Sequence, residues 1–286
     1  MSARKDMNTK KKYRGVVIPA ITPLNADHSL DQGAVEKLFA SFAQHRALAF
    51  ILGTTGEAPS LPSGLKQAYV RQAARLRQPG DKLYVGISSH CFYDSVELAK
   101  FSFGEGADVV VANLPSYYVL PEGQMKRYFE QLVEKIAGPL IIYNIPSTTH
   151  MSIPLSVIDE LSHHPHIVGT KDSERNEERL QASLQLWSGR EDFSHFLGWS
   201  ARSGEALLNG GDGLVPSTGN LAPGLYVDME AAAERGDKEK VDELQALSDQ
   251  LGKTYQGSGF PGESIARLKS LLHEDGLCQP YMMPPL

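Results

Sequence analysis

The chain has 286 residues, of which 41% are hydrophobic and 22% are charged. This ordinary globular composition excludes a disordered chain, a collagen-like repeat and a small disulfide-stapled scaffold. Twenty-eight Lys and Arg residues against 34 Asp and Glu give a net charge of −6, which argues against a nucleic-acid partner, because nucleic-acid-binding proteins favour a clustered basic surface.

The first twelve residues carry a basic cluster that we expect to form a flexible, solvated tail; a polyanion site is the alternative. They do not form a signal peptide, because the next apolar segment is short and ends at Pro23. No stretch is long enough to span a bilayer. Cys91 and Cys278 lack the spacing of a metal or redox site. We therefore expect a cytoplasmic protein with reduced thiols, no metal and no membrane partner.

Eight short apolar runs alternate with longer amphipathic stretches along the chain. Their starts lie 19 to 34 residues apart, which leaves room for a helix and a right-handed crossover between successive strands. The runs that predict strands are 16–21, 49–52, 83–87, 108–112, 140–143, 167–171, 194–197 and 213–215.

Helical periodicity is clearest in segments 35–45 and 123–136, where apolar residues recur at the spacing of an amphipathic helix. Pro154 is expected to open the next helix, because proline is tolerated in the first helical turn. Weaker patterns predict helices over 180–187 and 204–209.

Nearly continuous apolar runs of this kind are typical of parallel strands covered by helices. We therefore predict an α/β fold, a (β/α)8 TIM barrel with a C-terminal helical extension; a doubly wound open sheet is the alternative. The expected divisions are a flexible basic tail over 1–12, the catalytic barrel over 13–225, and two or three packed helices over 226–286.

Segment 257–262 spells GxGxxG, the pattern of a dinucleotide-binding loop. Such a loop requires a strand before it and a helix after it. Helical sequence precedes this segment and a proline lies inside it, so we predict a loop between helices. Segment 210–213 is likewise expected to be a turn into the eighth strand.

Function in such a barrel is located at the C-terminal ends of the strands, where the connecting loops converge. Lys171 is the unusual residue there, because it ends the sixth strand. Its amine would point into a partly desolvated mouth, where loss of the ammonium form creates a nucleophile towards carbonyls. The alternatives are a solvated lysine or a pair with Asp172. The polar segments at the strand ends are GTTGE (53–57), PSYY (115–118), YNIP (143–146), GTKD (169–172), GWS (198–200) and PSTGN (216–220).

Two further features accompany Lys171. Tyr143 ends the adjacent strand, where its phenol can relay protons, or it is a core residue. Thr54 and Thr55 lie in a glycine-flanked loop that can offer N–H groups and hydroxyls to a carboxylate, or that is a tight turn. Amine, phenol and carboxylate cradle together predict a pyruvate site.

The order GTTGE, Tyr-Tyr, YNIP, GTK, GxS and STGN resembles the dihydrodipicolinate synthase and N-acetylneuraminate lyase family, from about Gly15 to about Gly276. The resemblance implies a class I aldolase or lyase on a (β/α)8 barrel, without a cofactor. By resemblance, Lys171 would form the Schiff base and Tyr143 would relay protons. Tyr118 would reach across a subunit interface, which implies a homotetramer built from two tight dimers. The substrate-binding set implied is Thr54, Thr55, Gly56, Gly198 and Ser217.

Two departures from the family pattern concern the second substrate. Dihydrodipicolinate synthases carry a Gly-Arg pair after YNxP, whereas Ser147-Thr148 stands here, and a hydroxyl cannot replace a guanidinium fork. N-acetylneuraminate lyases carry an acidic pair after strand seven, whereas Ser200-Ala201 stands here. His150, Trp199 and Ser217 are candidates for shaping this pocket. The alternative for His150 and Trp199 is a structural histidine and a core tryptophan.

We therefore expect a pyruvate-dependent Schiff-base aldolase or lyase that releases or condenses pyruvate and an aldehyde. A 2-keto-3-deoxy sugar acid is the expected substrate. The alternatives are a 4-hydroxy-tetrahydrodipicolinate synthase, a keto-deoxy sugar acid dehydratase with the same imine chemistry, and a non-catalytic 2-oxo acid binding protein.

Overall fold

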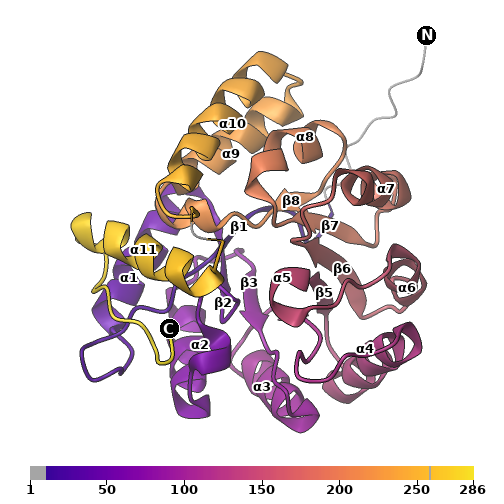
Figure 1. Cartoon of the computed structure of the whole chain (residues 1–286), viewed down its shortest axis with the longest axis horizontal. Coiled ribbons are helices and arrows are strands. Elements are labelled where there is room, and N and C mark those ends of the chain that lie inside the picture. Colours follow the sequence, from indigo (N-terminus) through magenta and orange to yellow (C-terminus); the bar gives the residue numbers. More distant parts are fainter. Residues whose placement is uncertain (1–10, 258) are drawn as a thin grey trace.

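The computed structural model describes residues 11–257 and 259–286, and in this part of the chain eight parallel strands close into a barrel. Each strand pairs with its neighbours in chain order, and β1 pairs with both β2 and β8. This closure confirms the predicted TIM barrel and excludes the open sheet. Figure 1 shows the strands as the inner ring of the molecule. They are β1 (Gly15–Pro19), β2 (Leu48–Ile51), β3 (Leu83–Gly86), β4 (Val109–Ala112), β5 (Leu140–Asn144), β6 (Ile167–Asp172), β7 (Ser194–Leu197) and β8 (Gly213–Leu214).

Helices follow the strands and form the outer ring. α1 begins ahead of the predicted segment because the Asp31 side chain accepts a hydrogen bond from the Ala34 N–H and caps the helix. Pro154 precedes α6 as its N-cap rather than lying in its first turn. The helices of the ring are α1 (Gln32–His45), α2 (Ser63–Leu76), α3 (Phe92–Gly104), α4 (Glu122–Ile136), α6 (Leu155–Leu161), α7 (Glu177–Trp187), α8 (Ser203–Leu208) and α9 (Pro223–Glu234). The short helix α5 (Pro146–Thr149) lies inside this ring, after β5 (Figure 1), and 3-10 turns form η1 (Ala58–Ser60), η2 (Ser200–Arg202) and η3 (Ser217–Asn220).

Helix α9 follows β8 and packs against β1 and α1, so it completes the ring of helices. The predicted boundary between residues 225 and 226 falls within it. α10 (Lys238–Lys253) packs on α8 and α9, and α11 (Pro261–Glu274) borders α1 together with the tail that follows it (Figure 1). The glycine-rich segment 257–262 joins α10 to the start of α11, as predicted for a loop between helices.

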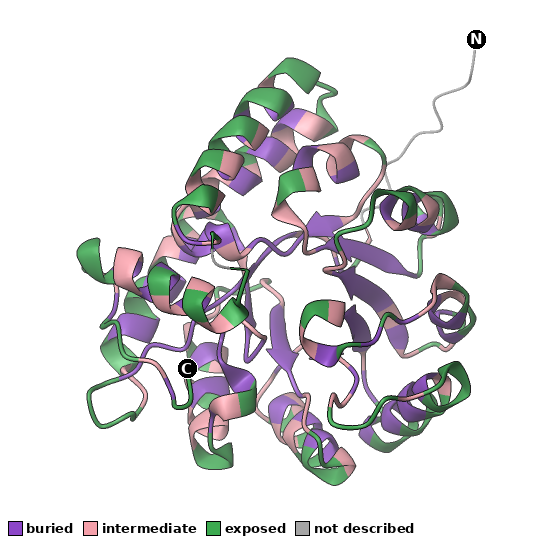
Figure 2. Cartoon of the chain, in the orientation of Figure 1, coloured by how far each residue is buried: buried purple, intermediate pink, exposed green. Residues whose placement is uncertain are grey.

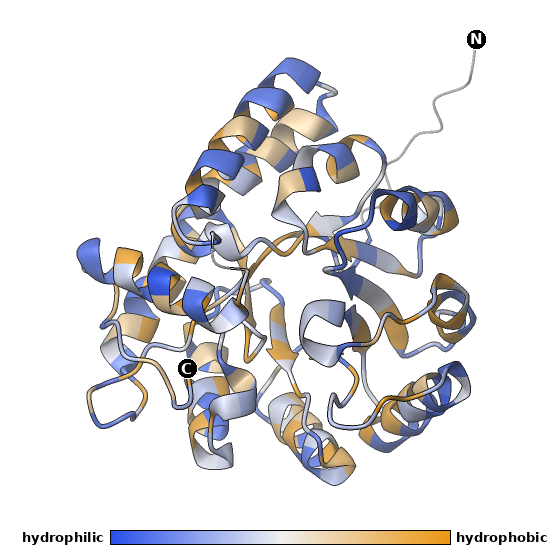
Figure 3. Cartoon of the chain, viewed as in Figure 1, coloured by the Kyte–Doolittle hydropathy of each residue, from blue (hydrophilic) through white to orange (hydrophobic). Residues whose placement is uncertain are grey.

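The apolar residues form two layers, one inside the barrel and one between the strands and the helices. Figure 2 shows buried strands and helices whose outer faces are exposed, and Figure 3 shows the matching alternation of hydropathy on the helices. Alternate strand residues supply the two layers because successive side chains point to opposite faces. Among the described residues, no helix is long and apolar enough to cross a membrane.

The start of the described chain differs from the predicted solvated tail. Lys11 is largely buried, with its Nζ 2.8 Å from Asp212 and 3.0 Å from the carbonyl of Phe193. The tail prediction failed for Lys11 because sequence patterning could not show that Asp212 would lie within reach. Residues 1–10 of the predicted tail lie outside the described residues.

Candidate active site

Lys171 and Tyr143 lie opposite each other in the pairing of β5 with β6. Both side chains are buried inside the barrel, and the Lys171 Nζ lies 3.8 Å from the centre of the Tyr143 ring and 5.0 Å from that of Phe50. Parallel pairing in register forces this contact, since facing residues of adjacent strands project to the same side. The predicted amine and phenol therefore lie together.

Asp172 is not the partner of Lys171. The strand alternation sends Asp172 out of the barrel, where its Oδ2 accepts a hydrogen bond of 2.6 Å from Arg179 Nε and its Oδ1 one of 3.1 Å from Asn144 Nδ2. Burial raises the pKa of Asp172, although Arg179 and the hydrogen bonds oppose it. The alternative of a Lys171–Asp172 pair is thereby excluded, and Lys171 faces aromatic rings rather than a carboxylate.

The Tyr143 phenol is biased towards ionisation. Burial opposes the phenolate, but the charge of Lys171 and hydrogen bonds with Lys171, Thr54 and Ser173 outweigh it, so the pKa of Tyr143 lies below its usual value. A phenol whose proton is more easily released can exchange that proton with an oxygen of a bound substrate. The surroundings of Tyr143 therefore suit a proton relay.

Segment 53–57 forms a tight turn after β2. The N–H groups of Gly56 and Glu57 bond within this turn, to the carbonyls of Gly53 and Thr54 at 3.1 and 3.0 Å. Among the described residues, no hydrogen bond occupies the N–H of Thr54 or Thr55. Their N–H groups and hydroxyls remain available to a carboxylate at the barrel mouth.

Gly56 is required by a close approach of two backbone segments. A Cβ at this position would lie 3.0 Å from the carbonyl oxygen of Ala20 and 3.2 Å from the nitrogen of Leu52. The Gly56 carbonyl accepts a hydrogen bond of 2.6 Å from Thr22. Gly56 therefore acts through the placement of the turn.

Gly198 makes room for Ser173, a residue that sequence analysis did not select. A Cβ at Gly198 would lie 2.1 Å from the Ser173 Oγ, and Ser173 is among the groups that lower the pKa of the Tyr143 phenol. The available signal was that Ser173 directly follows the sixth strand. Its hydroxyl became recognisable as a partner of Tyr143 only once the strands were paired.

Ser217 lies in a polar cluster formed with the segment after α10. Its Oγ lies 2.7 Å from the Tyr255 hydroxyl and accepts a bond of 3.3 Å from Gln256 Nε2. The Tyr255 hydroxyl also lies 2.9 Å from the Thr218 Oγ1. Tyr255 and Gln256 could not be recognised from the sequence, because nothing in their spacing connects them to the strand ends.

The remaining candidates lie apart from Lys171 in the single chain. Tyr118 is 73% exposed and stacks edge-on with Tyr117, with ring centres 4.9 Å apart. His150 is exposed at the end of α5, and Trp199 packs against Arg202. Among the described residues, no cluster of three or more His, Cys, Asp and Glu side chains could hold a metal ion.

Comparison with known proteins places the chain in a family. Residues 12–286 match the model of the dihydrodipicolinate synthetase family. A 4-hydroxy-tetrahydrodipicolinate synthase of Alkalilimnicola ehrlichii is 28% identical over 96% of this chain and 92% of its own, and a probable 2-dehydro-3-deoxy-D-pentonate aldolase of Escherichia coli is 26% identical over the same shares. The dihydrodipicolinate synthase structure from Bacteroides thetaiotaomicron superposes with a TM-score of 0.90 at 29% identity, over 96% of this chain and 92% of the other. The chain thus belongs to the dihydrodipicolinate synthetase family, and the predicted class, a lyase of the pyruvate-dependent Schiff-base kind, is confirmed at family level.

Proposed function

We propose that this lyase forms a Schiff base between Lys171 and the 2-oxo group of its substrate. The observation that carries the proposal is the contact between the Lys171 amine and Tyr143 inside the barrel mouth, away from any carboxylate partner among the described residues. A buried amine without an ion pair can serve as a nucleophile, and the adjacent phenol can serve as its proton relay.

The steps follow from these two groups. The neutral amine of Lys171 attacks the carbonyl carbon C2 to give a carbinolamine. The Tyr143 phenol then gives its proton to the departing hydroxyl, so that water leaves, a protonated imine forms and Tyr143 becomes the phenolate. The bond between C3 and C4 then breaks, and its electron pair moves into the imine to give an enamine. The Tyr143 phenolate takes the C4 hydroxyl proton as the aldehyde leaves. Protonation of C3 and hydrolysis of the imine release pyruvate and restore Lys171.

Thr54 and Thr55 are proposed to hold the substrate carboxylate. Their N–H groups, which make no hydrogen bond to the described residues, lie in a turn whose Thr54 also lowers the pKa of the Tyr143 phenol. Anchoring the carboxylate here would bring C2 towards the Lys171 amine, because the carboxylate carbon and C2 are bonded neighbours. Positioning of this kind contributes strongly to catalysis.

A 2-keto-3-deoxy sugar acid is the proposed substrate class. Uncharged hydroxyl groups occupy the relevant loops, with Ser147 and Thr148 after β5 and the Ser217–Tyr255–Gln256 cluster after β8. Hydroxyls and amides suit the hydroxyls of a sugar chain rather than a second carboxylate. The pentonate aldolase relative supports this choice.

A 4-hydroxy-tetrahydrodipicolinate synthase is the second candidate, favoured by the names of several relatives. It is weakened by the serine and threonine that stand in place of the Gly-Arg pair. A dehydratase with the same imine is a close variant of the proposal.

We further propose a cytoplasmic homo-oligomer, a tetramer built as a dimer of dimers. Tyr117, Tyr118 and Val119 are each more than 70% exposed in the single chain, and an apolar aromatic loop of this kind suits a subunit contact. The two free thiols, Cys91 and Cys278, support a reducing compartment.

The substrate proposal is tested with a panel of 2-keto-3-deoxy sugar acids, assayed by the release of pyruvate. Aspartate semialdehyde with pyruvate serves as the synthase arm, and loss of water without pyruvate release marks the dehydratase. Preferred cleavage of a keto-deoxy sugar acid supports the proposal. Condensation with aspartate semialdehyde alone would replace it with the second candidate.

A further inference from the structure

The proposed carboxylate loop ends at Glu57, whose side chain contacts the C-terminal extension. The Glu57 Oε1 lies 2.5 Å from the Lys269 Nζ of α11, and its Oε2 accepts a hydrogen bond of 2.7 Å from the N–H of Met283. Neither charged side chain has any exposed surface. The loop that carries Thr54 and Thr55 is therefore tied by a fully buried ion pair to a distant part of the chain.

Lys269 extends this connection to the tail. Its Nζ donates a hydrogen bond of 2.7 Å to the carbonyl of Tyr281, while Glu57 binds the backbone two residues later. The ion pair thus joins three segments, namely the turn after β2, helix α11 and residues 281–283. Burial lowers the pKa of Lys269, and the neighbouring Glu57 opposes that change.

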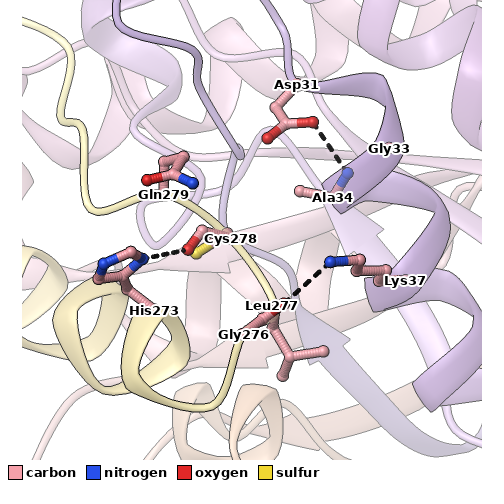
Figure 4. Close-up of a pocket in the computed structure, with 9 residues that line it drawn as sticks. All are labelled: Asp31, Gly33, Ala34, Lys37, His273, Gly276, Leu277, Cys278 and Gln279. Atoms are coloured by element: carbon pink, nitrogen blue, oxygen red, sulfur yellow. Dashed lines mark hydrogen bonds between the residues drawn. The ribbon is translucent and has the colours of Figure 1, made fainter.

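On its opposite side, towards α1, the C-terminal tail borders a pocket. A cavity of about 240 Å³ separates α1 from residues 276–279, and Figure 4 shows its walls. Lys37 crosses it to the Gly276 carbonyl at 3.0 Å, and His273 bonds to the Cys278 carbonyl at 3.0 Å. The tail therefore borders a pocket on the side of α1 and contacts Glu57 on its inner side, through the Met283 N–H.

The turn has little freedom to absorb a displacement of Glu57. Glu57 itself has a left-handed backbone conformation with φ of 56°, and Gly56 is pressed against the Ala20 carbonyl. Such a conformation persists in a residue with a side chain only where the surroundings hold it. Thr54 and Thr55 lie three and two residues before Glu57, so a movement of Glu57 is transmitted to them.

We propose that Glu57 and Lys269 are positioning residues of the active site, and that the C-terminal tail sets the carboxylate loop through them. This inference rests on the proposed role of Thr54 and Thr55. Removal of one charge leaves the other buried without compensation, which is strongly unfavourable, so the loop must move to hydrate it. Binding of the 2-oxo acid carboxylate then weakens, whereas Lys171 and Tyr143 keep their places on β6 and β5.

The first test measures the loop without any substrate. Hydrogen exchange of the amides in segment 53–58 is compared between the native protein, Lys269→Met and the matched control Lys11→Met, which breaks the Lys11–Asp212 pair instead. We expect exchange about tenfold faster in Lys269→Met and unchanged in the control. Unchanged exchange in Lys269→Met overturns the proposal.

If Lys269→Met does not fold, two other proteins are compared. The double variant Glu57→Gln/Lys269→Met is then the reference, and a chain ending at Gln279 is the perturbed form. The double variant leaves no buried charge at positions 57 and 269. The amide oxygen introduced at position 57 can still accept a hydrogen bond from the Met283 N–H. The shortened chain keeps α11 but loses the Tyr281 and Met283 contacts. Faster exchange in segment 53–58 of the shortened chain supports the proposal, and exchange equal to the reference contradicts it.

The second test measures pyruvate binding by borohydride trapping at increasing pyruvate concentration. In Lys269→Met the half-saturating concentration should rise about tenfold, with the maximal trapping rate changed by less than about threefold, and the double variant should restore it. A lower maximal rate with unchanged half-saturation contradicts a positioning role in carboxylate binding. A native protein that traps no pyruvate refutes the proposed function, while the exchange test still decides whether the tail sets the loop.

Discussion

The mouth of the barrel and the junction with α11, where Glu57 meets Lys269, each contain a buried lysine. The two lysines have different neighbours. Lys171 lies over the rings of Tyr143 and Phe50, whereas Lys269 lies against Glu57 and the Tyr281 carbonyl. The Lys269 amine is occupied by the Glu57 carboxylate and the Tyr281 carbonyl, so its role is structural. Among the described residues no carboxylate occupies the Lys171 amine, so it can reach the carbonyl of a bound substrate. The neighbours of a buried lysine, rather than its burial, separate the reactive from the structural one.

The largest expected effect comes from removing the amine at the mouth. In Lys171→Met, turnover should fall by at least roughly 10³-fold, because no other group can form the imine. The folding stability should stay within about 1 kcal/mol, since Lys171 makes no ion pair with the described residues. Steady-state kinetics and denaturant unfolding measure the two quantities. Residual turnover close to that of the native protein would show that Lys171 is not the reactive lysine.

Tyr143→Phe removes the relay and keeps the ring beneath Lys171. We expect turnover to fall by about 10² to 10⁴-fold, the usual contribution of general acid–base catalysis. Single-turnover kinetics on the preferred sugar acid provide the measurement, with Tyr84→Phe as a control, since Tyr84 is another buried tyrosine inside the barrel. Equal rates in native protein and Tyr143→Phe would remove this residue from the mechanism.

At the junction, replacing the lysine by methionine should lower the free energy of unfolding, which the same replacement at the barrel mouth leaves almost unchanged. Lys269→Met leaves Glu57 buried without its partner, and the free energy of unfolding should fall by about 3 to 5 kcal/mol. Urea unfolding followed by circular dichroism tests this. A loss of less than about 1 kcal/mol would show that the Glu57–Lys269 pair is not the structural counterpart of Lys171.

His195 is a third buried base, located in the barrel wall, and within the described residues no carboxylate bonds to its ring. Its Nε2 lies 3.3 Å from the Ser183 Oγ, and its Nδ1 has no hydrogen-bond partner among those residues. Burial, with the charges of Arg179 and Lys11, lowers its pKa from 6.5 to about 4.

The folded state therefore binds this proton more weakly than the unfolded state. The contribution of His195 to stability is complete above pH 6.5, and roughly 3 kcal/mol of it should be lost as the pH falls to 4. Unfolding free energies measured across this range should decline less steeply in His195→Gln than in the native protein. Parallel profiles for the two proteins would contradict the assignment.

Sequence patterns predicted the barrel because each strand and helix signal is local. They also predicted the Lys171–Tyr143 contact, since both residues end predicted strands that are adjacent in chain order. The Glu57–Lys269 pair could not be predicted, because its partners lie on segments whose relative placement depends on the whole fold. The burial of Lys11 and the Tyr255 and Gln256 contacts of Ser217 escaped prediction for the same reason. Ser173 was missed although it is local, because its role depends on the room that Gly198 leaves.

The most direct test of the account is the site of imine formation. The native protein is incubated with pyruvate and borohydride, digested and examined by peptide mass spectrometry, with Lys171→Met treated in parallel. The account predicts one reduced pyruvate adduct, on Lys171, and none in the variant. No adduct in the native protein, or an adduct on another lysine such as Lys269, would contradict it.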